Sequence, residues 1–144
     1  MRDTMFKIIT TEAEKQDAFD IRKEVFVKEQ GVPVENELDD YDAIATHIIG
    51  YNDNQQPFAT ARFRQYEQGV KIERVAIHPA FRKSGYGKKL MQFVEKSAAQ
   101  QGYTKLILNA QLHAKLFYSS LGYNSVGDIF YEEEIKHVKM VKSI

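Results

Sequence analysis

Apolar residues recur along the chain with two different spacings. Ala18, Ile21 and Val25 stand three and four positions apart, which predicts a helix with one buried face that continues to about position 30. Thr11 and Glu14 stand at capping-box spacing, so the helix is expected to begin there. Two further helices are predicted, over residues 85–101 and 114–121.

Shorter apolar or alternating runs between turn residues are typical of β-strands. The expected strands cover residues 6–9, 47–51, 58–65, 70–77, 105–110, 123–127 and 135–141. The element order is therefore β-α-β-β-β-α-β-α-β-β, which predicts an α+β fold or a mixed α/β arrangement of layers. With 144 residues and no repeat or linker, the chain is expected to form one domain over residues 1–144.

Composition narrows the classes of function. Lysine and arginine number 20, as do aspartate and glutamate, so no surplus positive charge favours binding to nucleic acid or to a membrane surface. The chain has no cysteine, which excludes disulfides, a thiolate nucleophile and Cys-ligated metal centres. The first ten residues lack a signal-peptide pattern and no apolar run could span a bilayer, so a cytoplasmic protein is expected.

Residues 35–42 (ENELDDYD) carry five acidic side chains in eight positions. Such a run is usually a solvated loop or a short helical turn. It could instead form the wall of a binding pocket and attract a cationic amine. The sequence leaves both interpretations open.

The stretch 75–90 (VAIHPAFRKSGYGKKL) carries the clearest chemical signal. A strand ends at Pro79, and the chain turns through a basic loop into the helix predicted over 85–101. Gly85 and Gly87 allow positive φ and a close approach of the backbone. Because unpaired N–H groups at a helix N-terminus bind anions, the loop predicts a phosphate or pyrophosphate site, unless it is only a solvated turn.

Two common nucleotide motifs do not fit this loop. A P-loop needs an upstream glycine and a Ser or Thr after its lysine, and both are missing around Gly87-Lys88-Lys89. A dinucleotide fingerprint needs a third glycine at the position where Leu90 stands. Neither type of nucleotide site is therefore predicted.

The loop resembles the phosphate-binding motif of the GNAT-type N-acetyltransferases. Residues 82–87 (RKSGYG) match the family pattern R/Q-x-x-G-x-G/A. Residues 114–123 (AKLFYSSLGY) match the family segment A-x-x-FY-x-x-LGF/Y, and the order of elements agrees over essentially the whole chain. Residues 21–30, 109–111 and 135–140 resemble a small bacterial subgroup whose substrate is uncertain.

This resemblance implies a mixed, mostly antiparallel sheet with helices on both faces: the GNAT acyl-CoA N-acyltransferase fold. Two central strands would separate near Ile77 and Asn109 to admit the pantetheine arm of acetyl-coenzyme A. A primary amine, on a small molecule or a protein, would attack the thioester directly. The residues that the resemblance places at the cosubstrate are Val75, Ala76, Ile77, Arg82, Lys83, Ser84, Gly85, Tyr86, Gly87, Lys88, Asn109, Phe117 and Tyr118.

The resemblance also implies three catalytic candidates. Tyr118 would protonate the departing thiolate of coenzyme A, since a phenol is protonated at neutral pH; otherwise it is an ordinary packing aromatic. Asn109 would bond pantetheine or an ordered water, unless it only caps its strand. Glu73 would draw a proton from the amine through water, unless it is a solvated strand carboxylate.

The four histidines do not form a metal-binding pattern. His47, His78, His113 and His137 are scattered without ligand spacing, so no metal is expected. His113 stands five residues before Tyr118 and could act in the acceptor cleft, or it could only cover the surface.

Two other functions stay open on the sequence alone. A non-catalytic module could bind acyl-coenzyme A as a sensor or recruit a partner, because cofactor binding and turnover use different residues. A regulatory phosphate-binding domain is also compatible with the loop, although residues 114–123 favour acyl transfer. The sequence determines neither the acceptor amine nor whether the chain forms a homodimer.

Overall fold

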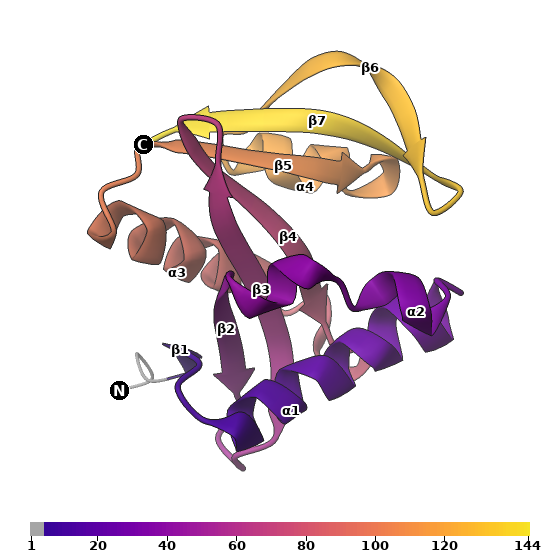
Figure 1. Cartoon of the computed structure of the whole chain (residues 1–144), viewed down its shortest axis with the longest axis vertical. Helices are drawn as coiled ribbons and strands as arrows, with labels where there is room; N and C mark the ends of the chain where they lie inside the picture. The colour runs from indigo at the N-terminus through magenta and orange to yellow at the C-terminus, as the bar shows by residue number, and fades with distance from the viewer. Residues whose placement is uncertain (1–4) are drawn as a thin grey trace.

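A computed structural model describes residues 5–144 and contains a seven-stranded sheet with the strand order β1-β2-β3-β4-β5-β7-β6 (Figure 1). The pairing is antiparallel except between β4 and β5. The first four residues, part of the segment in which no signal peptide is expected, lie outside the described residues. The strands are β1 (Phe6–Ile8), β2 (Thr46–Tyr51), β3 (Pro57–Tyr66), β4 (Gly69–Ile77), β5 (Lys105–Gln111), β6 (Asn124–Glu132) and β7 (Ile135–Ser143).

The first helix begins where the capping box predicts. Thr11 and Glu14 exchange the two capping hydrogen bonds at the start of α1 (Glu12–Arg22), which continues directly as a π-helical turn, η1 (Lys23–Glu29). The remaining helical segments are α2 (Val34–Glu37), η2 (Asp40–Ala43), η3 (Pro79–Phe81), α3 (Tyr86–Gln100), η4 (Leu112–Ala114) and α4 (Lys115–Ser120). The predicted mixed, mostly antiparallel sheet flanked by helices is confirmed. Within residues 5–144, no helix combines the length and apolar character needed to cross a membrane.

The sheet has an apolar core on each face. Ala18, Ile21 and Val25 of the first helix pack against Ile49 and Ala76 on one face. On the other face a larger core joins α3 and α4 to the strands, because the buried stripe of α3 lies against β3 and β4. The side chains that α3 contributes to it are Leu90, Met91, Val94 and Ala98.

The two central strands, β4 and β5, separate after only a short stretch of pairing. They pair in parallel from Val70 with Leu106 to Ile72 with Leu108. Beyond this point the two strands diverge toward their carboxyl ends (Figure 1). The separation expected from the resemblance therefore occurs, and it begins immediately before Asn109 on the β5 side.

A bulge in β4 explains why the strand bends there. Arg62 of β3 pairs with Glu73 and Thr60 pairs with Ala76, so Ala61 faces two residues of β4 instead of one. Arg74, one of those two, has a left-handed φ of 57°. A bulge of this kind kinks a strand and increases its twist, which turns β4 away from β5.

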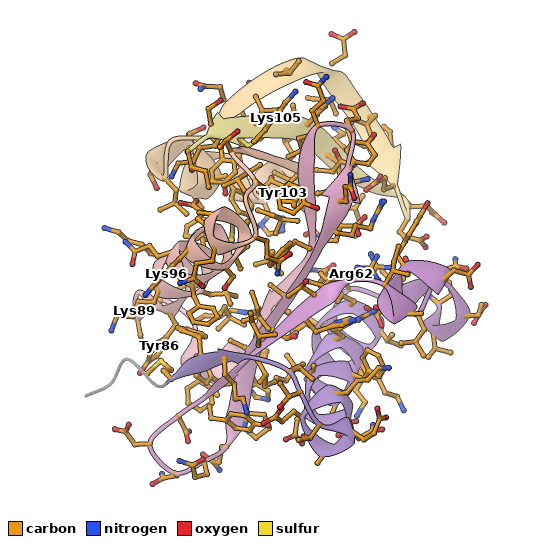
Figure 2. The ribbon with its side chains drawn as sticks, turned by 60° about the vertical axis from the view of Figure 1, so that its left-hand side comes forward. Arg62, Tyr86, Lys89, Lys96, Tyr103 and Lys105 are labelled. Atoms are coloured by element: carbon orange, nitrogen blue, oxygen red, sulfur yellow. The ribbon has the colours of Figure 1, made fainter. Side chains whose placement is uncertain are left out.

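The acidic run 35–42 forms short helical turns, and three of its five acids pair with arginines instead of being free in solvent. Glu37 is 3% exposed and accepts a hydrogen bond from Arg22 Nε at 2.7 Å. Asp39 and Asp42 pair with the buried Arg62, each at 2.7 Å from its Nη1. Arg62 lies where β3 approaches the α2–η2 segment (Figure 2). The run therefore attaches the α2–η2 segment to the sheet beside the bulge.

Candidate functional site

The loop before α3 has the backbone geometry of an anion site. Lys83 and Gly85 both have left-handed φ values, of 65° and 81°. Gly85 is the N-cap of α3, and no side chain hydrogen-bonds to the N-terminus of this helix. The free N–H groups of a helical first turn, together with the helix dipole, attract a phosphate.

Arg82, at the start of this loop, holds it in place. Its two Nη atoms donate to the two carboxylate oxygens of Glu29 at 2.6 and 2.7 Å, and its Nε donates to the Ile77 carbonyl at 2.9 Å. The hydrogen bond from Arg82 lowers the pKa of Glu29, while burial acts in the opposite direction. The guanidinium thus connects the loop both to η1 and to the end of β4.

Gly87 serves a different purpose from the one its sequence position suggests. Of this glycine pair only Gly85 has positive φ, so the expectation that Gly87 uses positive φ is wrong. A Cβ atom on Gly87 would stand 3.1 Å from Cζ of Phe117, which packs directly on the helix. Close approach is the reason for glycine here, and it brings α4 against the N-terminus of α3. Tyr86 begins this helix, with Lys89 near it (Figure 2).

Tyr118 lies on α4 in the larger core and is 8% exposed. Its ring packs edge-on against Phe117 and Tyr123, with centroids 5.0 and 5.8 Å away. Burial raises the pKa of the phenol, so the hydroxyl stays protonated throughout the neutral range. Within residues 5–144 nothing hydrogen-bonds to this hydroxyl, which leaves its proton available to a bound molecule.

Polar side chains border the gap on the side of β5. Asn109 donates from Nδ2 to Oε2 of Glu132 in β6 at 3.2 Å. Gln111 donates to Gln30, at the end of η1, at 2.8 Å, and its Oε1 lies 2.7 Å from Nε2 of His113. The amide of Asn109 is therefore held by a carboxylate, and His113 is connected to the gap through Gln111.

Glu73 lies on the β4 side of the gap and is held by cations. Its carboxylate accepts hydrogen bonds from Arg62 and Arg64, and the ammonium of Lys71 stands 3.7 Å away. Burial alone would raise the pKa of Glu73, but the hydrogen bond from Arg64 and the charges of the two arginines lower it. A carboxylate that is stabilised in its charged form is a weak proton acceptor, which disfavours the predicted role of Glu73 as a base.

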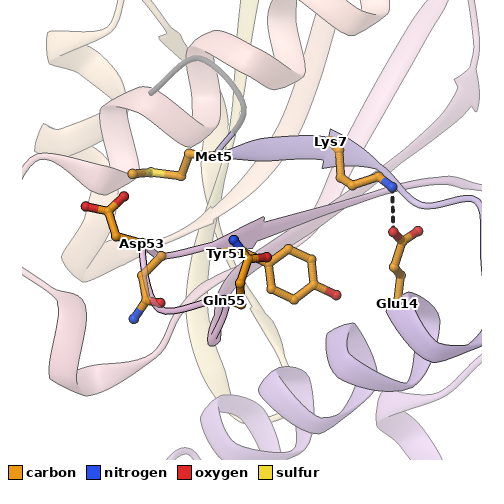
Figure 3. Close-up of a pocket in the computed structure, with 7 residues that line it drawn as sticks. Met5, Lys7, Glu14, Tyr51, Asp53 and Gln55 are labelled. Atoms are coloured by element: carbon orange, nitrogen blue, oxygen red, sulfur yellow. Dashed lines mark hydrogen bonds and ion pairs between the residues drawn. The ribbon is translucent and has the colours of Figure 1, made fainter. Parts of the chain in front are cut away.

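A separate polar hollow lies at the β1 edge of the sheet, where β1 and β2 meet the start of α1 (Figure 3). Lys7 and Glu14 form an ion pair at its rim. None of the residues expected at the cosubstrate lines this hollow. Its lining residues are Met5, Lys7, Glu14, Tyr51, Asn52, Asp53 and Gln55.

The structure places the end of β4 and Asn109 on the two sides of one gap, and it places Phe117 close to Gly87 of the loop over 82–88. Sequence reasoning missed Glu29 and Glu132, which hold Arg82 and Asn109. Glu29 falls inside the stretch 21–30 that resembles the bacterial subgroup, but the resemblance assigns no role to this residue. Glu132 gave no signal, because its partner is 23 residues away in the chain.

Comparison with known proteins identifies the family of the chain. A family model for the acetyltransferase (GNAT) domain matches residues 9–144. The chain is 38% identical to YjcF of Bacillus subtilis, an uncharacterised N-acetyltransferase, over 94% of this chain and 96% of that protein.

Solved structures show the same fold. An acyl-CoA N-acyltransferase from Pseudomonas aeruginosa superposes with a TM-score of 0.87 at 28% identity, covering 96% of this chain and 98% of that one. An aminoglycoside 6′-N-acetyltransferase complexed with coenzyme A shares the fold with a TM-score of 0.73 at 15% identity, covering 96% of each chain. The chain therefore belongs to the GNAT family of acyl-CoA-dependent N-acyltransferases.

Proposed function

We propose that this protein transfers the acetyl group of acetyl-coenzyme A to a primary amine, on a small molecule or a protein. The observation that carries the proposal is the gap between β4 and β5, together with the uncapped N-terminus of α3 after β4 and with Tyr118 on α4, which contacts β5 and whose hydroxyl has no hydrogen bond within residues 5–144. One molecule of acetyl-coenzyme A seated in this gap would place its pyrophosphate at the anion site and its thioester near the proton donor.

The loop over 82–88 would hold the pyrophosphate mainly through backbone N–H groups. Arg82 would keep the loop in place, since Glu29 already occupies its guanidinium. Lys83 and Lys88 are exposed and would add positive charge beside the phosphates. Ser84 and Tyr86 would contribute N–H groups at the start of the helix.

The pantetheine arm would lie along the unpaired edge of β4, over Val75, Ala76 and Ile77. A backbone N–H near the bulge would polarise the thioester carbonyl as the amine attacks. Asn109, turned toward Glu132, would border the reacting centre on the β5 side. Phe117 would cover the cosubstrate next to Gly87.

The chemical step forms a C–N bond to the acetyl carbon and breaks the C–S bond. The ammonium form of the acceptor must first lose a proton. The thiolate that leaves would then take the proton of Tyr118. The nitrogen would lose its second proton to solvent as the amide forms, and the phenol would regain a proton from solvent. The net reaction gives an amide, free coenzyme A and one proton.

The direct test is release of coenzyme A from acetyl-coenzyme A over a panel of amines that includes aminoglycosides, polyamines, amino acids and a lysine peptide. Turnover of any amine above the blank supports the proposal. Binding of acetyl-coenzyme A without turnover of any amine would favour a non-catalytic acyl-coenzyme A sensor.

Acetyl-coenzyme A is expected to raise the melting temperature of the folded protein. A ligand at 100 times its Kd stabilises the folded state by about 2.7 kcal/mol, which corresponds to a shift of about 5–11 °C for a chain of this length. Free adenine should give a much smaller shift, because it lacks the pyrophosphate and the pantetheine. No shift with acetyl-coenzyme A or with coenzyme A would rule out the proposed cosubstrate site.

Replacing Gly87 by valine is expected to weaken binding of acetyl-coenzyme A by about tenfold, or about 1.4 kcal/mol, in a calorimetric titration. The new side chain displaces Phe117 and crowds the phosphate site, while valine is no worse than glycine in a helix. Gln92→Val is the matched control, because Gln92 is exposed on the same helix beyond its first turn. Equal affinities for the two variants would place the phosphates elsewhere.

A further inference from the structure

A histidine on β7 and a carboxylate on β6 form a pair on the two strands beyond β5. His137 is 8% exposed and stands opposite Gln111 in the pairing of β5 with β7. Its Nε2 lies 3.8 Å from Oε1 of Glu132, whose other oxygen accepts the hydrogen bond from Asn109. The pair is thus connected to the first residue of β5 beyond its pairing with β4.

The contacts of His137 determine which ring nitrogen carries the proton. Nδ1 lies 2.7 Å from the carbonyl oxygen of Ile135, and a carbonyl can only accept a hydrogen bond. Nδ1 is therefore the protonated nitrogen of the neutral ring, and Nε2 has the free electron pair. The ring is also stacked on Phe130 at 5.9 Å between centroids, which fixes its orientation. An imidazole whose Nδ1 donates in this way can accept a proton at Nε2.

The reaction requires such a group, because an amine cannot attack a thioester while it is protonated. Glu73 is unsuited, since its cationic neighbours stabilise the carboxylate. We propose that His137 is the general base: Nε2 accepts a proton from the acceptor ammonium, and Glu132 stabilises the imidazolium that forms. The inference rests on the proposed acetyl transfer and assigns the first of the two protons that the acceptor nitrogen loses.

The proton balance is simple. One N–H bond of the ammonium breaks and one Nε2–H bond forms, which leaves a neutral amine whose electron pair attacks the acetyl carbon. His137 later releases the proton to solvent. Charged or titratable groups on β7, on the elements packed against it and in the β6–β7 turn affect this step. Apart from Glu132 they are Lys105, His113, Asp128, Tyr131, Glu133, Glu134, Lys136, Lys139 and Lys142.

The decisive variant is His137→Asn. The asparagine amide can still donate to the Ile135 carbonyl in place of Nδ1, so the β6–β7 hairpin keeps this bond, whereas the proton acceptor at Nε2 is lost. The experiment measures kcat/KM against pH from about 5.5 to 9, with acetyl-coenzyme A and whichever amine of the panel the wild type acetylates fastest. The melting temperature and the Kd for acetyl-coenzyme A are measured in parallel.

We expect kcat/KM of H137N to fall by about 100-fold at neutral pH, within the range typical of a positioned base. The acidic limb of the wild-type pH profile should disappear, while the Kd for acetyl-coenzyme A stays within about twofold. Glu132→Gln should lower kcat/KM less than H137N and keep the acidic limb. A merely structural role for His137 would lower the melting temperature without changing the shape of the profile.

Three results would overturn the inference. One is an H137N profile with wild-type shape and height. Another is loss of the acidic limb in His113→Gln instead, which would transfer the role to the other histidine near the gap. The third is a wild-type chain that acetylates no amine: the proposed function then fails in the wild-type measurement itself, and the base assignment fails with it.

Discussion

The variant Tyr118→Phe is expected to lower kcat for acetyl transfer by at least about tenfold, which corresponds to about 1.4 kcal/mol of additional barrier. The change removes the phenol proton and keeps the ring, so the packing against Phe117 and Tyr123 is retained. Positioned proton donors typically accelerate a step by about 10²- to 10⁴-fold. The smaller threshold allows for a water molecule that delivers the proton in the variant.

The loss at Tyr118 should appear in kcat rather than in the KM for acetyl-coenzyme A. The donor acts on charge that develops on sulfur in the transition state, so binding of the intact thioester does not depend on it. Because burial raises the pKa of the phenol, the wild-type donor should also work without loss up to alkaline pH. Initial rates at saturating amine and varied acetyl-coenzyme A separate the two constants.

Tyr123→Phe is the matched control for this prediction. Tyr123 is also buried and lies in the same segment, but its hydroxyl donates to Glu95 at 2.9 Å, away from the gap. Its loss should lower stability by about 1 kcal/mol, the typical value of one hydrogen bond, and leave kcat unchanged. A Tyr118→Phe enzyme with wild-type kcat, or equal losses in both variants, would reduce Tyr118 to a packing residue.

Local sequence patterns were sufficient to predict the helices and strands and the loop over 82–88. The capping box of Thr11 and Glu14 and the spacing of the apolar residues on α3 operate within a few positions, where the chain is its own environment. The glycine at position 85 is likewise recognisable, since its left-handed φ follows from the turn that begins α3.

Features that depend on distant partners could not be predicted in this way. Gly87 is small because Phe117 packs on it, 30 positions later in the chain. Arg62 stands in a strand whose alternation gives no reason to bury an arginine, and its burial depends on acids outside that strand. The bulge at Arg74 is equally invisible, because an extra residue in a strand is defined only by the strand beside it.

The same distant contacts explain how the site is held open. Arg74, at the bulge, donates from Nε to Glu37 of α2 at 3.0 Å and from Nη2 to the Glu37 carbonyl at 2.8 Å. Glu37 also pairs with the buried Arg22 of α1. The residue that bends β4 is therefore tied to the helical layer, so that the gap and the packing of α1 and α2 depend on one another.

Replacing Arg62 by methionine is expected to destabilise the fold by about 3–5 kcal/mol, because removal of one partner leaves buried charges uncompensated. Arg62 is 1% exposed, and its guanidinium binds Asp39, Asp42 and Glu73 at 2.7 to 3.2 Å. The melting temperature should fall by about 6–20 °C, as measured by calorimetry near neutral pH. Methionine has a similar length, so the lost volume contributes little.

The dependence of stability on pH provides the second measurement for Arg62. Burial opposes ionisation of Asp39, Asp42 and Glu73, yet their arginine partners hold all three pKa values below the ordinary range. The stability that these groups contribute is complete above about pH 5 and is lost as the pH falls through their folded-state pKa values. In R62M the loss of stability at low pH should be smaller, because without Arg62 the folded-state pKa values of the acids lie closer to their unfolded-state values.

Lys28→Met is the matched control, because it breaks an exposed pair with Glu24, at 3.8 Å within η1. Such pairs contribute about 0–1 kcal/mol, so the melting temperature and its dependence on pH should stay near those of the wild type. Arg62 can then be judged against a variant with the same change of charge and the same new side chain. If R62M melts within about 2 °C of K28M and shows the same acid dependence, the buried ion network does not hold the α2–η2 segment to the sheet, and the bulge in β4 must be maintained by packing alone.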